Sequence, residues 1–299
     1  MKNGVVYFCG GTKPILEMLI SIYSLKKHYK GEITILLGET SIEHISKLEL
    51  NKLGNIKIVT VPNSANDDEV RKHWSTRWRA MNFVNYDKVL HLDCDTVVVK
   101  PIDNLFDHIH NDKSYITTFD NFSNCEYSTW ANHLDMYKEN DNWFKINHVK
   151  PLYIEFGLMG WNRGYPYFND VSDMCKKMKD DQTAMSAVLI KNGRKGFSPK
   201  SENFNVIRRT RNYYRLSYDQ YFEVAVWHLT TSKTRYPGYS VWWNEFIEAY
   251  MNNYLGFKTN KKIIEELQPH VYKAMIKRNY PINNCFSGHV YLLKNSDII

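Results

Sequence analysis

The clearest sign of chemistry in this sequence is a pair of aspartates, Asp93 and Asp95, that directly follows an apolar run, Lys88–Leu92. On an extended backbone, side chains two residues apart point to the same side, so both carboxylates are expected to face together. Two like charges at the end of a buried strand are costly without a counter-charge. A divalent cation with oxygen ligands is the natural partner, and such ions also bridge to substrate phosphates. The alternative is a plain solvated turn at a strand end.

The elements before the aspartates predict their place in a fold. Apolar runs typical of strands lie at Val5–Cys9, Ile33–Leu37, Ile56–Val61 and Lys88–Leu92. Helices are predicted between them, over Ile15–Leu25, Ser41–Leu50 and Thr76–Val84. This alternation indicates an α/β fold with a mostly parallel sheet covered on both faces. Such sheets bind ligands at the carboxyl ends of their strands, where the aspartates are expected.

The pattern becomes less regular beyond Pro101 and changes again near Tyr236. Strands are predicted at Tyr115–Phe119, Tyr153–Trp161 and Glu223–Leu229, and a helix at Asp181–Ile190. Two further helices are predicted over Val241–Leu255 and Lys261–Leu267. We therefore expect a catalytic α/β domain over residues 1–235 and a helical appendage over residues 236–299.

Composition narrows the class of protein. The chain has 299 residues, 43% of them hydrophobic, which excludes a disordered protein or a disulfide-stapled miniprotein. The formal charge of +7 suits an anionic ligand such as a nucleoside diphosphate, and it is too small to require nucleic acid. The five cysteines include no CxxC pair, which argues against a zinc site and favours a reducing compartment.

The N-terminus predicts where the protein acts. A core strand begins almost at the first residue, with no apolar segment typical of a signal peptide. No stretch reaches the roughly 20 apolar residues of a membrane span. We expect a cytoplasmic protein for which peripheral membrane association stays open.

Two further motifs are compatible with ligand binding. Gly10-Gly11-Thr12 follows the first strand, and glycine allows a ligand to approach the backbone closely, although a tight turn explains it equally well. The motif is neither a dinucleotide-binding fingerprint nor a P-loop. Asp181-Gln182 is typical of a helix start, where an acidic residue is favourable.

The segment Tyr86–Phe106, which contains Leu92-Asp93-Cys94-Asp95-Thr96, resembles the DxD strand of GT-A-fold glycosyltransferases. It is most similar to family 8, the glycogenin and lipopolysaccharide galactosyltransferase group. Further matches follow in that family's order, at Arg77, Phe156–Asn162, Asp181–Ala184 and Val226–Thr230. The resemblance covers roughly residues 4–235 and implies a GT-A, Rossmann-like fold.

The resemblance also implies an activity and a set of site residues. The activity is transfer of a sugar from a nucleotide-sugar donor, typically a UDP-sugar, to a hydroxyl group of a glycan, glycolipid or protein. Asp93, Asp95 and His228 would hold Mn²⁺ or Mg²⁺. Residues implied in donor binding are Cys9, Gly10, Gly11, Thr12, Arg77, Asp93, Cys94, Asp95 and Gly157. Residues implied in the transfer are Asp181, Gln182 and Lys233.

Several positions depart from the family pattern or have a simpler explanation. Glu155-Phe156, Thr183 and Thr231 replace residues typical of the family, which leaves the sugar unidentified. Taken alone, His228 between Trp227 and Leu229 is typical of a packed core histidine. The amide of Gln182 is a weak base, which favours retention of the anomeric configuration, and Glu155 is the candidate base for inversion.

Three rival functions fit parts of the sequence. The run Asp93–Val97 also fits the first motif of haloacid-dehalogenase-like phosphatases, but that motif normally opens the core sheet and three strand-like runs precede it here. A non-catalytic carbohydrate-binding protein is a second alternative. A basic RNA-binding protein is a third, supported only by the arginines between Arg208 and Arg215.

Overall fold

A seven-stranded sheet forms the centre of the computed structural model, which describes residues 1–11, 14–39, 43, 45–62, 69–109, 115–117, 143–148, 156–178, 181–192, 197–198, 207–209, 224–229 and 239–269. Its strand order is β3-β2-β1-β4-β7-β6-β8. The strands are β1 (Asn3–Cys9), β2 (Glu32–Gly38), β3 (Ile56–Val61), β4 (Lys88–Leu92), β6 (Tyr115–Thr117), β7 (Leu158–Asn162) and β8 (Phe197–Ser198). The pairs from β3 to β4 are parallel, and β7 is antiparallel to both β4 and β6. The mostly parallel sheet expected from the sequence is confirmed.

A second, three-stranded sheet continues from the end of β4. It consists of β5 (Thr96–Val98), β10 (Val226–His228) and β9 (Ile207–Arg209), with β10 in the middle. The strand β10 runs antiparallel to β5, and its register places His228 opposite Thr96. A residue from late in the chain is thereby fixed beside the turn that follows β4.

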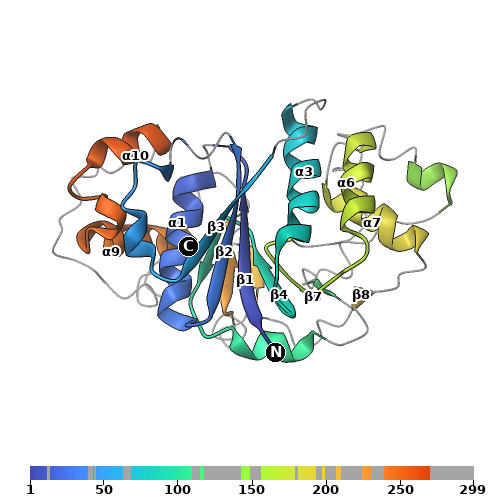
Figure 1. The fold of residues 1–299 in the computed structure, drawn as a ribbon, viewed down its shortest axis with the longest axis horizontal. Helices are drawn as coiled ribbons and strands as arrows, with labels where there is room; N and C mark the ends of the chain where they lie inside the picture. Colours follow the sequence, from blue (N-terminus) through green and yellow to red (C-terminus); the bar gives the residue numbers. More distant parts are fainter. Residues whose placement is uncertain are drawn as a thin grey trace, which may run out of the picture.

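Helices cover both faces of the large sheet (Figure 1). On one side lie α1 (Pro14–His28), α9 (Tyr239–Met251) and α10 (Lys261–Leu267), and on the other α3 (Glu69–Ala80), α6 (Phe168–Lys177) and α7 (Asp181–Lys191). Strand β1 shows why both faces are apolar. Val5 and Tyr7 belong to the core that contains α1 and α9, whereas Val6 and Phe8 belong to the core that contains α6 and α7.

Short 3₁₀ segments connect some of these elements. They are η1 (Leu50–Leu53), η2 (Met81–Phe83), η3 (Asp103–His108) and η5 (Tyr254–Gly256). Among the described residues, no helix combines the length and the apolar character that crossing a membrane requires.

The first strands match the sequence-based prediction well. The strands predicted at Ile56–Val61 and Lys88–Leu92 have those bounds, and β1 and β2 contain the predicted ranges. The helix predicted over Ser41–Leu50 is wrong in its described second half, where residues 46–48 form a turn and a bend. The Ser46 hydroxyl there donates to the carbonyl of Glu43 at 2.8 Å, a side-chain bond that competes with helix formation.

Other boundaries shift for local reasons. Of the strand predicted over Tyr153–Trp161, residues 153–155 lie outside the described residues, residues 156–157 form a turn, and β7 begins at Leu158. The helix predicted over Val241–Leu255 ends at Met251, and Asn253 follows with a left-handed φ of 50°. Helix α6 and strand β5 were not predicted at all.

The described C-terminal helices pack directly on α1. Lys27 of α1 forms ion pairs with Glu245 and Glu248 of α9, at 2.7 and 2.8 Å. The rings of Trp242 and Phe246 are fully buried in the same core as α1. The predicted domain boundary between residues 235 and 236 lies outside the described residues and stays a prediction.

The close packing of Tyr86 over Gly4 provides a test of this sheet. A Cβ on Gly4 would overlap the Tyr86 ring, which is buried and whose hydroxyl is hydrogen-bonded to Thr34 at 2.6 Å. We expect Gly4→Ala to lower the free energy of unfolding by about 1–3 kcal/mol, the usual cost of overpacking. Urea denaturation measures it.

The control is the same substitution in a Tyr86→Leu background, where the ring is absent. There the added methyl group should cost much less, giving a clear coupling energy in a double-mutant cycle. Equal costs in the two backgrounds would contradict the packing described.

Candidate active site

The two aspartates lie in a turn between β4 and β5, at the carboxyl edge of the parallel strands. The Asp93 amide donates to the carbonyl of Gly157 at 3.2 Å, and the Cys94 thiol donates to the carbonyl of Phe8 at 3.0 Å. The carbonyl of Asp95 accepts the amide of Leu229 at 2.8 Å. Backbone groups in or next to three strands, β1, β7 and β10, therefore fix the turn.

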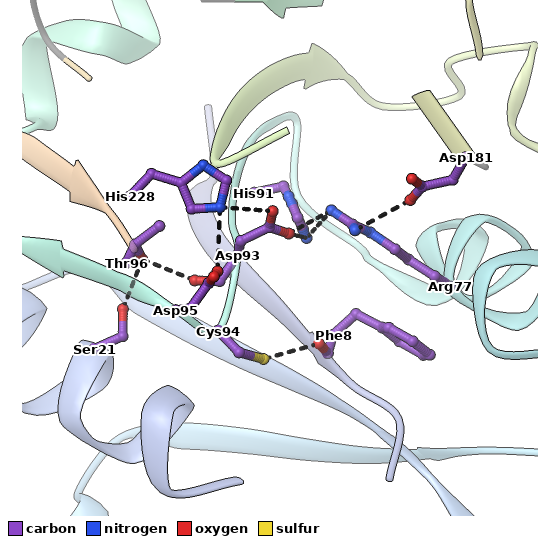
Figure 2. A network of polar contacts seen from close by, with 10 residues as sticks. All are labelled: Phe8, Ser21, Arg77, His91, Asp93, Cys94, Asp95, Thr96, Asp181 and His228. Atoms are coloured by element: carbon purple, nitrogen blue, oxygen red, sulfur yellow. Dashed lines mark hydrogen bonds and ion pairs between the residues drawn. The ribbon is translucent and has the colours of Figure 1, made fainter. Parts of the chain in front are cut away.

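His228 reaches both carboxylates from the neighbouring strand β10. Its Nε2 lies 3.5 Å from Oδ2 of Asp93 and 3.2 Å from Oδ1 of Asp95 (Figure 2). The imidazole is buried, whereas both aspartates are partly exposed. The three side chains therefore converge on a point that solvent or a ligand can reach.

The three groups fit a divalent cation. One ligand atom from each of Asp93, Asp95 and His228 lies within 4.8 Å of the others, and among the described residues this is the group of acidic, histidine and cysteine side chains that could hold a metal. Two carboxylates with one imidazole suit Mn²⁺, and carboxylates alone also suit Mg²⁺. The donor set matches the cation that the sequence predicted.

Arg77 connects this group to the start of helix α7. Its Nη2 donates to Oδ1 of Asp93 at 2.6 Å, and its Nη1 donates to Oδ2 of Asp181 at 3.3 Å (Figure 2). The guanidinium also lies over the rings of Trp78 and Phe156. The guanidinium of Arg77 thus links a candidate metal ligand, Asp93, to Asp181, a residue that the family resemblance implies in the transfer.

Burial and neighbouring charges have opposite effects on the pKa of Arg77, whereas both lower the pKa of His91. Burial alone would lower the pKa of Arg77, but the charges of Asp93 and Asp181 outweigh it and raise the pKa. Burial lowers the pKa of His91 well below its usual value, and the neighbouring charge of Arg77 lowers it further. His91 is therefore neutral, and its Nε2 lies 3.4 Å from Nη2 of Arg77, where it can only accept.

The end of β1 lies beside the same turn. Cys9 is buried at the end of the strand, and the thiols of Cys9 and Cys94 interact, which together with burial raises the pKa of Cys94 well above its usual value. Gly10 and Gly11 follow, and Gly11 has a φ of 101°, which favours glycine. Cys94 serves the packing under the site, since a buried thiol with a raised pKa is a poor nucleophile, and Cys9 is buried beside it.

The remaining predicted residues divide into described and undescribed positions. Gly157 contacts Asp93 through its carbonyl, and Asp181 and Gln182 open helix α7, with Asp181 buried and Gln182 half-buried. Thr12 and Lys233 lie outside the described residues, as does Glu155.

Sequence reasoning missed His91. It lies two residues before Asp93 on β4, so both side chains project to the same side, and its ring is 1% exposed. This spacing of two residues was the signal in the sequence that could have identified His91 as part of the site. The pairing of Arg77 with Asp181 carries no local signal, because the two residues are far apart in the chain.

Comparison with known proteins places this site in a family. The family model described as "Mannosyltransferase putative" matches residues 2–202, more than half of the chain. The chain belongs to this mannosyltransferase family. It is a glycosyltransferase, as the DxD motif and its neighbours predicted. No curated protein matches the sequence significantly.

Solved structures show the same fold for this glycosyltransferase. The galactosyltransferase LgtC, solved with donor and acceptor sugar analogs, superimposes with a TM-score of 0.50 at 17% identity, covering 78% of this chain and 88% of LgtC. The bifunctional glycosyltransferase WbbM gives a TM-score of 0.58 at 16% identity, covering 87% of this chain and 51% of WbbM. The glycosyltransferase GlyE of Streptococcus pneumoniae TIGR4 gives a TM-score of 0.54 at 14% identity, covering 82% of this chain and 60% of GlyE.

These likenesses confirm the GT-A fold, and the strand order and the family match argue against the rival functions. The chain spans about half of WbbM and three fifths of GlyE, so the likeness concerns only part of those proteins. The phosphatase alternative required the DxD strand to open the sheet, but β1, β2 and β3 precede it. The family match likewise favours an enzyme over a passive carbohydrate binder or an RNA-binding protein.

The buried neutral His91 predicts how stability depends on pH. The groups that face it are Arg77 from α3, Asp93 from its own strand end and His228 from β10. A lowered pKa in the folded state means that the unfolded chain binds more protons, so stability rises with pH and is lost as pH falls below about 6.5. We expect His91→Gln to flatten that loss by up to about 1.4 kcal/mol per pH unit.

Urea unfolding of the metal-free protein at pH 7.5 and pH 5.5 measures this difference. The exposed His108, replaced by glutamine, is the matched control for removal of an imidazole at the surface. The same loss of stability in wild type and His91→Gln would contradict the burial of a neutral imidazole.

Proposed function

We propose that this glycosyltransferase transfers a hexose from a nucleoside-diphosphate donor and binds Mn²⁺ or Mg²⁺ through Asp93, Asp95 and His228. The observation that carries the proposal is the convergence of these three side chains within 4.8 Å at the carboxyl edge of the sheet. When bound, the cation offsets the negative charge that develops on the diphosphate as its bond to the sugar breaks.

The chain's own residues supply the rest of the proposed chemistry. Arg77 adds a fixed positive charge 2.6 Å from Asp93, which favours an anionic group in the same place. Through its bond to Asp181 it also orients the first residue of α7, beside Gln182. The backbone after Cys9, with Gly10 and Gly11, offers room for the nucleoside because these residues carry no side chain beyond a hydrogen.

The donor and acceptor are proposed as classes. The resemblance to family 8 favours a UDP-linked sugar, whereas the matched family model is described by mannosyl transfer. We propose a hydroxyl group of a glycan, glycolipid or protein as acceptor. A panel of UDP-glucose, UDP-galactose and GDP-mannose is tested with Mn²⁺, and release of the nucleoside diphosphate is measured. This assay identifies the donor without knowledge of the acceptor, because slow hydrolysis of the donor by water also releases the nucleoside diphosphate.

We also propose that residues 1–235 form the catalytic domain and residues 236–299 an appendage. The described helices of this appendage, α9 and α10, pack against α1 on the face opposite α3 and α7 and share the core of the catalytic domain there. We further propose that Lys233 and Thr12 contribute to the donor site, because the family resemblance implies both residues there.

The first test of the proposal removes one ligand. Asp95→Asn replaces a charged ligand by a neutral amide of the same shape, so we expect release of the nucleoside diphosphate to fall at least about 100-fold. The matched control is Asp173→Asn, which changes an exposed aspartate whose ion pair with Lys176 lies on the surface of α6. Unchanged turnover in a folded Asp95→Asn variant would refute the metal-dependent proposal.

The second test concerns stereochemistry. In the proposed site Asp181 is paired with Arg77 and Gln182 is a weak base, so the described residues favour retention over inversion. We expect the sugar released first to have the same anomeric configuration as in the donor. NMR of the anomeric proton, recorded before mutarotation, measures it. The opposite configuration would contradict retention and make Glu155 the next residue to replace.

A further inference from the structure

A continuous series of buried hydroxyl groups leads from the sheet to the DxD turn. The Tyr7 hydroxyl lies 2.9 Å from Oγ of Ser21, which lies 2.8 Å from Oγ1 of Thr96. Oγ1 of Thr96 in turn donates to the backbone carbonyl of Asp93 at 2.8 Å. These three hydroxyl residues are fully buried and belong to three elements, β1, α1 and β5.

The direction of this hydroxyl chain follows from its last bond. A carbonyl oxygen only accepts, so the single proton of Thr96 is used on Asp93. The Thr96 oxygen must then accept from Ser21, and the Ser21 oxygen must accept from Tyr7. Burial raises the pKa of Tyr7, which keeps the first donor protonated. Every hydroxyl therefore donates toward Asp93, an arrangement in which successive bonds strengthen one another.

The structure assigns Tyr7, Ser21 and Thr96 as positioning residues for the metal-binding turn. Their bonds fix the peptide carbonyl of Asp93, and this orientation sets the direction in which the Asp93 and Asp95 carboxylates leave the backbone (Figure 2). A metal site needs its ligands within about 0.5 Å of the productive geometry. The inference rests on the proposed function, because it concerns residues that position the proposed ligands.

A purely structural role for these hydroxyls is the competing explanation, and helix α1 contains the control that separates the two. Ser24 is fully buried like Ser21, and its Oγ accepts the amide of Val98 at 3.0 Å and donates to the carbonyl of Ser21 at 2.7 Å. It makes as many bonds as Ser21, but its partners are Val98 and Ser21 and not Thr96, the residue that bonds to the carbonyl of Asp93. Loss of either serine hydroxyl should therefore destabilise the fold, while only Ser21 should affect the turn.

The experiment compares Mn²⁺ binding with thermal stability in purified full-length variants. Mn²⁺ alone is titrated and the free ion is followed by EPR, and the melting temperature is measured without metal. We expect Thr96→Val to raise the dissociation constant for Mn²⁺ about tenfold or more, as loss of a partner outside the ligand set usually does. Ser21→Ala should raise it by a smaller factor and Tyr7→Phe by the least, because each lies one bond further from Asp93.

Two variants decide between positioning and stability. Thr96→Ser keeps the hydroxyl and should bind Mn²⁺ like wild type, and Ser24→Ala should lower the melting temperature about as much as Ser21→Ala without changing Mn²⁺ affinity. If Ser24→Ala and Ser21→Ala weaken binding equally, the assignment is wrong. Should Ser21→Ala fail to fold, the pair Thr96→Val and Thr96→Ser decides, and equal affinities in that pair would overturn it.

The same titrations distinguish failure of the proposed function from failure of the positioning role. A wild-type protein that binds no Mn²⁺ at all would refute the metal site and, with it, the positioning role. A wild type that binds Mn²⁺ with affinities unchanged across every variant would refute the positioning role alone.

Discussion

The architecture of this glycosyltransferase depends on holding like charges together at one edge of its sheet. Asp93 and Asp95 leave the same short turn, and in a partly buried place their mutual repulsion is costly unless cations offset it. Arg77 provides one positive charge, directly bonded to Asp93 and shared with Asp181. The imidazole of His228 completes a group of side chains that could hold a divalent cation.

The site forms only when distant parts of the chain pair correctly. His228 reaches the aspartates because β10 pairs with β5 in a register that aligns it with Thr96. Helix α7 brings Asp181 to Arg77 of α3, on the same face of the large sheet. Because the second sheet must be in place before the three side chains meet, the proposed metal binding would report on the complete fold and not on the DxD turn alone.

Much of this fold could be predicted from local patterns, and part of the site could not. The strands β3 and β4 have their predicted bounds because each is a short apolar run with clear stops. Helix α6 was missed although its buried residues, Phe168, Val171 and Cys175, recur at the spacing of an amphipathic helix, so this signal was present in the sequence. The aspartate pair was recognisable because a spacing of two on an extended backbone has a direct geometric meaning.

The partners of that pair were harder to predict. His228 was identified through family resemblance, since its local sequence resembles a core histidine. The bonds of Arg77 to Asp181 and of Ser21 to Thr96 join residues far apart in the chain, and no periodicity or motif encodes such contacts. Tertiary pairing supplies them, so they become visible only in the folded molecule.

The central claim is that three converging side chains bind one cation, and anomalous diffraction tests it most directly. Crystals soaked with Mn²⁺ and a nucleoside diphosphate, measured at the manganese absorption edge, should give a single strong anomalous peak between Asp93, Asp95 and His228, in contact with the diphosphate. An anomalous map with no peak there, in crystals where the nucleotide is clearly bound, would contradict the account.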